Sequence, residues 1–380
     1  MPGVELEAFF GTDMSVRGYA DREFGTNVVW DTPLTEGYRH TFLSTDPRVQ
    51  SVGMWSITAK GLRRQFRRFR PNVVLLTAYA GRFHMEAWWA ARAIGARVII
   101  RHEASDVAAA RSTWKSVVRE VLLRRLYARI DGFAAIGTEA RRHLLRLGVP
   151  EARLGSAPYC VDSDFFAGEV TRWMPQRESM RRELGIGPDG ITLVFSGKLI
   201  PKKDPLLICA AVARLPEEAR ARLHFIVAGD GDLRSALESA AHAVLGARVK
   251  LFGFLNQSEI GRVYASGDVL VIPSRRGAGE TWGLVVNEAM QFGLPVIAGD
   301  GVGCGPDLLP DQRTGRIFES GNDISLASKL TEILRELPAA RAQYAEMTKA
   351  RIALFTTEMA AAGIAQVAAR VCSQTVRIQA

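Results

Sequence analysis

Short apolar runs that alternate with amphipathic stretches constrain the fold of this chain more than any other feature. In the second half these runs occupy residues 191–196, 223–228, 250–252, 269–272 and 295–298. In the first half they occupy residues 4–10, 72–77, 96–100 and 133–136. Helical patterns lie between them, and at the C-terminal end they cover 324–337, 339–355 and 357–371. Apolar strands joined by helices predict an α/β protein with parallel sheets covered on both faces.

The chain is long enough for two domains, and a polar stretch at 162–190 interrupts the alternation. We therefore predict a first Rossmann-like domain over residues 1–165 and a second, nucleotide-sugar-binding domain over residues 166–355. Residues 356–380 are expected to form a helix that packs back towards the first domain. Ligands of doubly wound sheets bind beyond the carboxyl ends of the strands, so the site is expected in the cleft between the domains.

Composition narrows the class of partner. The net charge of +9 favours an anionic partner, such as a nucleoside diphosphate, an anionic lipid or nucleic acid. The four cysteines are widely spaced and show neither metal-ligand spacing nor a disulfide framework, which predicts a cytoplasmic protein. No apolar run is judged long enough to cross a membrane. We predict no metal and no cofactor.

Glu280 and Glu288 lie eight positions apart around the sequence Trp282-Gly283-Leu284-Val285. A helix that begins near Gly283 presents unpaired N–H groups and its positive dipole end, which suits a diphosphate. Glycine also lets a ligand approach the backbone, and each carboxylate can accept hydrogen bonds from a vicinal diol. The alternative is two solvated glutamates on an ordinary surface helix.

Each of the remaining candidate residues follows an expected strand. In the second half they are Gly197, Lys198, Lys203, Gly229, Gly231, Phe254 and Ser274. Lysine supplies a point charge for phosphate, and glycine turns bring backbone close to a ligand. In the first half the candidate is His102, for which a structural role is an equal alternative. For the lysines and glycines the alternatives are a solvated loop and simple turns.

Together these motifs resemble those of the retaining glycosyltransferases of family 4, the group 1 glycosyl transferases, which have the GT-B fold. The resemblance covers nearly the whole chain and is strongest over residues 191–322. It implies two Rossmann-like domains facing across a cleft. It also implies that Glu280 contacts the donor sugar, that Glu288 holds the ribose, and that Lys198 and Lys203 bind the diphosphate. His102 matches a histidine that the family places near the reacting centre.

One feature departs from the family pattern. The family begins with a strand, a glycine-rich loop and a helix, whereas residues 4–10 match its second strand. We expect the reading frame upstream of Met1 to encode the first unit; the alternative is a degenerate chain. The Asp162 and Asp164 pair, which resembles a metal-binding D-x-D, is interpreted as chance because it lies in the interdomain connection.

The resemblance implies a retaining hexosyltransferase that moves a sugar from a UDP- or GDP-sugar to a hydroxyl group. The acceptor would be lipid-linked or a saccharide, in surface polysaccharide or glycolipid biosynthesis. Two alternatives stay open: a non-catalytic nucleotide-sugar-binding protein, and a sugar-nucleotide epimerase of the same fold. A binding test without turnover separates the first from an enzyme.

The basic run at 60–70 has two interpretations. Leu62, Phe66 and Phe69 share one helical face, and the arginines take the other. The helix either packs on the core with a solvated basic face or makes a peripheral contact with an anionic membrane at its cytoplasmic side. No nucleic-acid partner is expected, because no recognition motif accompanies the charge.

Overall fold

A computed structural model describes residues 3–21, 23–49, 53–108 and 113–376. Its C-terminal half contains a six-stranded sheet in the order β11-β10-β9-β12-β13-β14, with every neighbouring pair parallel. The strands are β9 (Ile191–Ser196), β10 (Leu223–Ala228), β11 (Val249–Leu251), β12 (Val269–Ile272), β13 (Val296–Gly299) and β14 (Gly315–Phe318). The chain winds outwards from β9 in one direction and then returns to wind from β12 in the other. This is the doubly wound arrangement that the sequence predicts.

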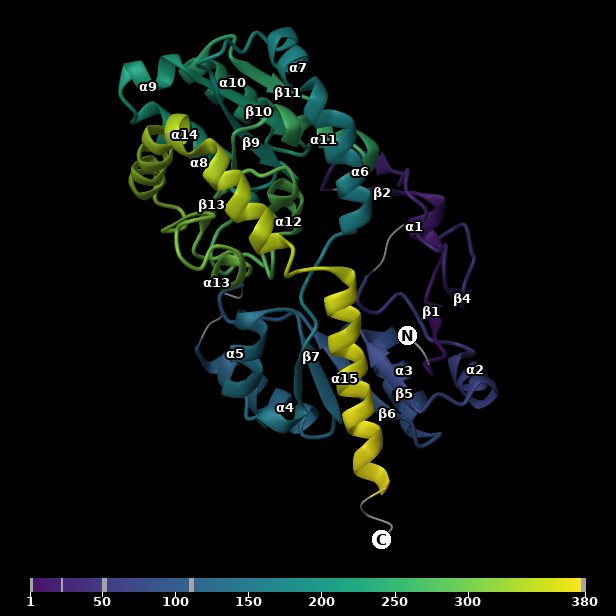
Figure 1. The fold of residues 1–380 in the computed structure, drawn as a ribbon. Helices are drawn as coiled ribbons and strands as arrows, with labels where there is room; N and C mark the ends of the chain where they lie inside the picture. Colours follow the sequence, from purple (N-terminus) through teal and green to yellow (C-terminus); the bar gives the residue numbers. More distant parts are fainter. Residues whose placement is uncertain (1–2, 22, 50–52, 109–112, 377–380) are drawn as a thin grey trace.

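Helices cover both faces of this sheet (Figure 1). They are α8 (Leu206–Ala213), α9 (Glu217–Ala221), α10 (Arg234–Leu245), α11 (Gln257–Ser266), α12 (Leu284–Gln291), α13 (Gly305–Leu308) and α14 (Asp323–Ile352). Side chains alternate across each strand, so Leu193 and Phe195 enter the buried cluster under α8, α10 and α14. Val194 enters the opposite cluster, with α11 and α12. Burial on both faces explains why these strands are continuous apolar runs.

The N-terminal half is built on a four-stranded parallel sheet whose strands follow chain order. These are β5 (Val73–Leu76), β6 (Arg97–His102), β7 (Gly132–Ala135) and β8 (Leu154–Ser156), joined through α3 (Arg82–Arg92), α4 (Thr113–Tyr127) and α5 (Thr138–Arg146). The C-terminal helix α15 (Thr357–Val376) lies along this sheet (Figure 1). A Cβ at Gly155 would come within 2.3 Å of Val367, which shows how closely the helix approaches the strands.

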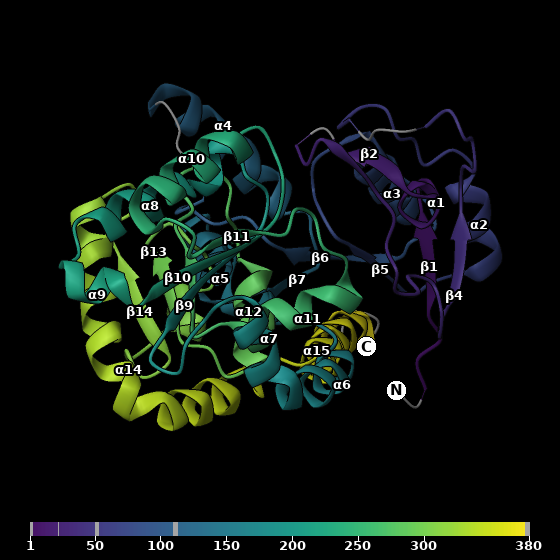
Figure 2. The ribbon, with the colours of Figure 1, turned by 90° about the horizontal axis from the view of Figure 1, so that it is seen from above.

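The first seventy residues differ from the single sheet that was expected. β1 (Glu7–Phe10) pairs in parallel with β4 (Arg39–Phe42), and β2 (Tyr19–Asp21) pairs in antiparallel fashion with β3 (Thr26–Val28). Neither pair joins the four-stranded sheet. Seen from above, β1 and β4 lie beside α2 (Leu62–Phe69), away from the C-terminal sheet (Figure 2). The remaining short helix here is α1 (Met14–Arg17). The connection to the C-terminal half consists of α6 (Ser163–Trp173) and α7 (Arg177–Glu183).

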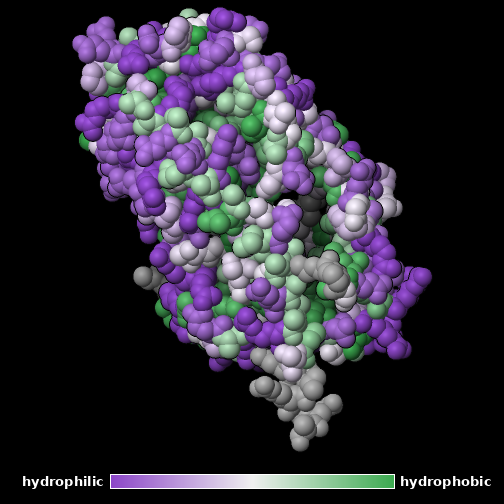
Figure 3. Space-filling view, in the orientation of Figure 1, coloured by the Kyte–Doolittle hydropathy of each residue, from purple (hydrophilic) through white to green (hydrophobic). Residues whose placement is uncertain are grey.

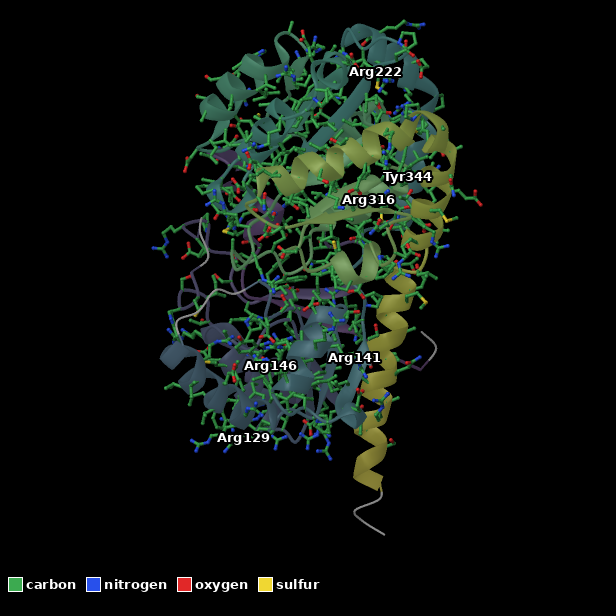
Figure 4. The ribbon with its side chains drawn as sticks, turned by 90° about the vertical axis from the view of Figure 1, so that its left-hand side faces the viewer. Arg129, Arg141, Arg146, Arg222, Arg316 and Tyr344 are labelled. Atoms are coloured by element: carbon green, nitrogen blue, oxygen red, sulfur yellow. The ribbon has the colours of Figure 1, made fainter. Side chains whose placement is uncertain are left out.

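The prediction of two helices on either side of Pro338 was wrong, because α14 passes through this residue as one helix. Contacts on both sides of the proline hold the helix together. Arg316 on β14 donates a hydrogen bond of 2.7 Å to Glu336, and Tyr344 donates one of 2.5 Å to the same carboxylate. Figure 4 shows Arg316 and Tyr344 lying together at this edge. Proline removes one backbone hydrogen bond, which these side-chain contacts help to offset.

The judgement that no apolar run reaches membrane-spanning length also needs correction. The helical region Asp323–Ser373 contains an 18-residue window with a mean hydropathy of 1.4, which passes the test of length and composition. In this structure α15 packs against β6, β7 and β8. Val367 and Val371 on its inner face are 1–2% exposed. Such packing is typical of a helix that covers a sheet.

Candidate functional site

The sheet topology brings the predicted motifs to one place. β9 lies between β10 and β12, and the direction of winding reverses between β9 and β12. The loops after these two strands diverge and leave a crevice at their carboxyl ends. Lys198 lies in the loop after β9, and Ser274 and Glu280 lie in the loop after β12. On the surface, a dark hollow opens to the right of the centre of the molecule (Figure 3).

Glu280 is the centre of the first cluster. Its Oε2 accepts a hydrogen bond of 2.9 Å from Ser274 Oγ and forms an ion pair with Lys203. The N-terminal half also holds this loop, because the Gly277 and Gly279 amides donate hydrogen bonds of 2.8 Å to the carbonyls of residues 107 and 108. Three residues predicted separately for the donor site therefore meet at the boundary between the halves.

Glu288 lies one helical turn into α12 and faces α11. The Tyr264 hydroxyl donates a hydrogen bond of 2.6 Å to Glu288 Oε2. Burial raises the pKa of Glu288 to about 7, although the hydrogen bond from Tyr264 lowers it. A ligand that donates hydrogen bonds to this group would favour its charged form.

The backbone at the start of α12 has the geometry expected for a phosphate site. Gly283 caps the helix with φ 102° and ψ 67°, a left-handed conformation that favours glycine. A Cβ there would lie 3.0 Å from Ile272 and 3.1 Å from Val302. The N–H groups of Leu284 and Val285 belong to the first turn, where no carbonyl of the helix can accept them. Both residues keep exposed surface, so an anion can reach this helix end.

The indole of Trp282 is buried and does not belong to this phosphate site. It is 2% exposed, and its Nε1 donates a hydrogen bond of 2.7 Å to Asn287. The ring packs between Tyr159 and Phe355, with centroid distances of 6.2 and 6.0 Å. The indole therefore stabilises the boundary between the halves. Only the backbone of Trp282 could therefore contact the donor, and the predicted role of this residue in donor binding stays a prediction.

Gly197 and Gly229 allow the loops after β9 and β10 to touch. A Cβ at Gly229 would lie 1.8 Å from the Gly197 carbonyl oxygen, and the φ of 152° is unusual for other residues. At Gly231, a Cβ would lie 2.7 Å from the Leu199 carbonyl. Gly229 and Gly231 are required by the close packing of the two loops, whereas Gly197 is favoured by its φ of 142°. A role of these glycines in ligand binding stays a prediction.

Lys198 binds residues that were not predicted from the sequence. Its Nζ donates hydrogen bonds of 2.9 Å to Asp21 and 2.8 Å to Glu23, and it lies 4.9 Å from the centre of the Phe24 ring. Phe24 in turn packs edge-to-face against Phe254, at 5.1 Å. The partners lie more than 170 positions away in the chain, and no local pattern links them. Tyr264, the partner of Glu288, was also missed, because it lies 24 positions earlier on a different helix.

His102 is buried, with 1% of its surface exposed. Its Nε2 lies 2.7 Å from the Tyr127 hydroxyl, and its ring stacks between His143 and Tyr79. Burial, together with a smaller contribution from the nearby His143, lowers the pKa of His102 to about 3, so the ring is neutral. The structure adds no support for contact between this ring and a substrate, and a catalytic role stays a prediction.

Metal ligands do not gather anywhere in the described ranges, which contain no cluster of three or more His, Cys, Asp or Glu suited to a metal ion. Asp162, part of the D-x-D sequence, caps α6 by accepting a hydrogen bond of 2.9 Å from the Phe165 amide. This pair of aspartates therefore begins a helix outside the crevice.

Comparison with known proteins agrees with this arrangement. The family described as Glycosyl transferases group 1 matches residues 176–351, and the Glycosyl transferase 4-like domain matches residues 13–160. A GDP-mannose-dependent alpha-mannosyltransferase of Mycobacterium tuberculosis is 30% identical over 79% of this chain and 72% of its own length. The chain belongs to the group 1 glycosyltransferases. The two matches divide it close to the polar connection.

Other relatives define how far this similarity extends. Sulfoquinovosyl transferase SQD2 of Arabidopsis thaliana is 34% identical over 46% of this glycosyltransferase chain and 32% of its own length. The structure of Anabaena HepE in complex with UDP superposes with a TM-score of 0.63 at 16% identity, covering 81% of this chain and 80% of that one. This likeness confirms the predicted GT-B fold. The chain spans between 30% and 58% of the length of the first three curated relatives it matches.

Proposed function

We propose that this chain transfers a hexose from a nucleoside diphosphate to a hydroxyl group, with retention of configuration. The main support for the proposal is that Glu280, Lys203 and Ser274 contact one another beside the start of α12. In the proposal, Lys198, Lys203 and the first amides of α12 stabilise the charge that develops on the leaving diphosphate. Glu280 orients the sugar, and Glu288 accepts hydrogen bonds from the ribose.

The relatives do not agree on the base of the donor, and they do not identify the acceptor. The name of the M. tuberculosis relative specifies GDP-mannose, whereas the HepE structure contains UDP. We therefore propose a UDP- or GDP-sugar as donor. As acceptor we propose a lipid-linked or saccharide hydroxyl, in glycan or glycolipid biosynthesis at the cytoplasmic side of a membrane. No nucleic-acid partner is proposed.

The test is a panel of UDP- and GDP-hexoses incubated with lipid and saccharide acceptors. The proposal predicts release of nucleoside diphosphate that depends on the acceptor, together with a product whose anomeric configuration matches that of the donor by NMR. Epimerised donor without release of nucleoside diphosphate would indicate a sugar-nucleotide epimerase. Binding without any turnover would indicate a nucleotide-sugar-binding protein.

Activity is expected to persist in the presence of a metal chelator. The groups proposed to meet the diphosphate are lysines and backbone amides, which need no divalent ion to neutralise charge. Turnover should stay within about twofold when EDTA replaces magnesium or manganese. If activity disappeared in EDTA and returned only with one of these ions, the D-x-D interpretation of Asp162 and Asp164 would have to be reconsidered.

A peripheral contact with anionic membrane is proposed for α2. Leu62 and Phe66 are buried, so the apolar face of this helix packs on the protein. The arginines on its other face and just beyond its end are exposed; they are Arg63, Arg64, Arg67, Arg68 and Arg70. Basic residues near an anionic surface contribute about 1 kcal/mol each, and salt screens this attraction.

Replacing these five arginines with glutamine should abolish co-sedimentation with phosphatidylglycerol vesicles at about 0.1 M salt. Wild-type binding should itself fall steeply as salt increases. A control variant removes the same number of arginines from the C-terminal half: Arg182, Arg214, Arg220, Arg222 and Arg313. Unchanged binding of the α2 variant, or equal loss in both variants, would exclude a specific contact through α2.

A second candidate for membrane contact is an exposed apolar face of α4, which lies at the opposite end of the N-terminal half from α2 (Figure 1). Val117, Val118, Val121 and Leu122 share one side of this helix and are 45–62% exposed. At the end of α4, Arg129 lies at the tip of the N-terminal half that points away from the C-terminal half (Figure 4). Serine at positions 117 and 121 should weaken vesicle binding at high salt, where the electrostatic part is screened.

A further inference from the structure

The loop after β9 carries a closed set of ion pairs at the place where the diphosphate is expected. Lys198 is bound by both Asp21 and Glu23, and Lys202 lies 3.5 Å from Glu23. Two lysines of the C-terminal half therefore meet two carboxylates of the N-terminal half. Burial by itself would lower the pKa of Lys198, but hydrogen bonds to Glu23 and Asp21 raise it. The hydrogen bond from Lys198 lowers the pKa of Glu23.

Contacts on either side fix this arrangement. The Glu23 backbone carbonyl lies 2.9 Å from the position of a Cβ at Gly231, so glycine is what lets it approach. Phe24 covers Lys198 and packs on Phe254.

Further along the N-terminal segment, two polar contacts reach the start of α11. Asn256 donates a hydrogen bond of 2.6 Å to the Val29 carbonyl, and the Ser258 amide donates one of 3.1 Å to Asp31. β2 accordingly lies beside the C-terminal half (Figure 1).

A carboxylate and a phosphate compete for the same lysine because both are anionic oxygen acceptors. If the diphosphate bound while Asp21 and Glu23 stayed in place, several negative charges would gather around Lys198, and like charges at close range are unfavourable. One set of anions must therefore leave before the other can bind.

We propose that Asp21 and Glu23 form an autoinhibitory contact, which occupies the cations of the donor-diphosphate site until a nucleotide displaces them. This inference rests on the proposed function of the loop after β9. The apparent affinity for nucleotide is then reduced by the fraction of molecules in which the contact is closed. Donor binding would be coupled to movement of the N-terminal segment that carries these carboxylates.

The experiment is a calorimetric titration of UDP and of GDP into the full chain and into its Asp21→Asn/Glu23→Gln double variant. Partly exposed ion pairs are individually weak, so the double variant should bind the preferred nucleotide roughly 2- to 10-fold more tightly. The single variant Glu23→Gln, at a side chain that is 50% exposed, should show a smaller gain without any risk to folding.

Asp31→Asn is the matched control, because Asp31 also contacts the C-terminal half but touches Ser258 rather than a lysine. Its affinity should stay within twofold of wild type. Adding Lys198→Gln to the double variant should remove the gain, since the freed cation is then absent.

The outcomes separate the two proposals. Equal or weaker nucleotide binding by the double variant overturns the autoinhibitory contact and leaves the proposed function intact. The same gain in Asp31→Asn also overturns it, because general loosening would then be the cause. If neither wild type nor any variant bound UDP or GDP, the proposed function would fail, and the inference with it.

Discussion

Glu288→Gln is expected to weaken binding of the sugar donor and of the free nucleoside diphosphate by a similar factor. Glutamine keeps the shape of the side chain but loses the charge that strengthens hydrogen bonds to the ribose. Loss of a hydrogen bond to a charged group costs about 1.5–3 kcal/mol, or roughly 10- to 100-fold in affinity. Calorimetry with both ligands measures it. The control is Glu259→Gln, an exposed glutamate on α11.

The pKa of Glu288 adds a second readout. Its value of about 7 in the unliganded protein means that the carboxylate forms fully only above neutral pH. Affinity for a nucleotide-sugar, whose esterified diphosphate does not titrate in this range, should therefore rise between pH 6 and pH 8 in wild type, and this rise should be absent in Glu288→Gln. Unchanged affinity in the variant at both pH values would show that Glu288 is a structural partner of Tyr264 only.

Glu280→Gln should lower kcat by roughly 100-fold, the order of effect seen when one positioned electrostatic partner of a transition state is removed. Affinity for the free nucleoside diphosphate should stay nearly intact, because Glu280 is proposed to contact the sugar. The ion pair with Lys203 means that any change in nucleotide affinity should be a small gain, since the substitution removes a carboxylate that competes with phosphate for this lysine. Loss confined to kcat is the pattern of an interaction made mainly in the transition state.

Steady-state kinetics with the best donor, combined with calorimetry of UDP and GDP, tests this second prediction. If Glu280→Gln and Glu288→Gln lost nucleotide affinity equally, the division of roles between them would be wrong, although the site itself would survive. If neither variant changed affinity or turnover, both glutamates would be ordinary surface residues around α12.

The central strands could be predicted because burial on both faces leaves a continuous apolar run. β9, β10 and β12 begin and end where the sequence pattern placed them. β14 was missed because Arg316 interrupts its apolar pattern, and the charge of Arg316 is matched by glutamates of α14. Short strands that depend on a distant partner carry no clear local pattern.

In the candidate site, too, some features could be predicted from the sequence and others could not. The positions of Lys203, Ser274 and Glu280 after their strands followed from the alternation of strands and helices. The contacts of Lys198 with Asp21 and Glu23 could not be predicted, because they join segments about 175 residues apart. Trp282 lies next to a predicted ligand-binding glycine, yet tertiary packing buries its indole at the boundary between the halves. Sequence therefore located the loops better than it assigned each side chain.

Thermal unfolding in a panel of nucleotides and nucleotide-sugars tests the central claim most directly, because a ligand that binds only the native protein raises its stability. At about 100 times the dissociation constant this amounts to about 2.7 kcal/mol. UDP or GDP, and sugars carrying the same base, should raise the Tm of wild type by several degrees, and Glu288→Gln should reduce this shift. Absence of any shift with millimolar UDP, GDP and their sugars would contradict a nucleotide-sugar site in this crevice.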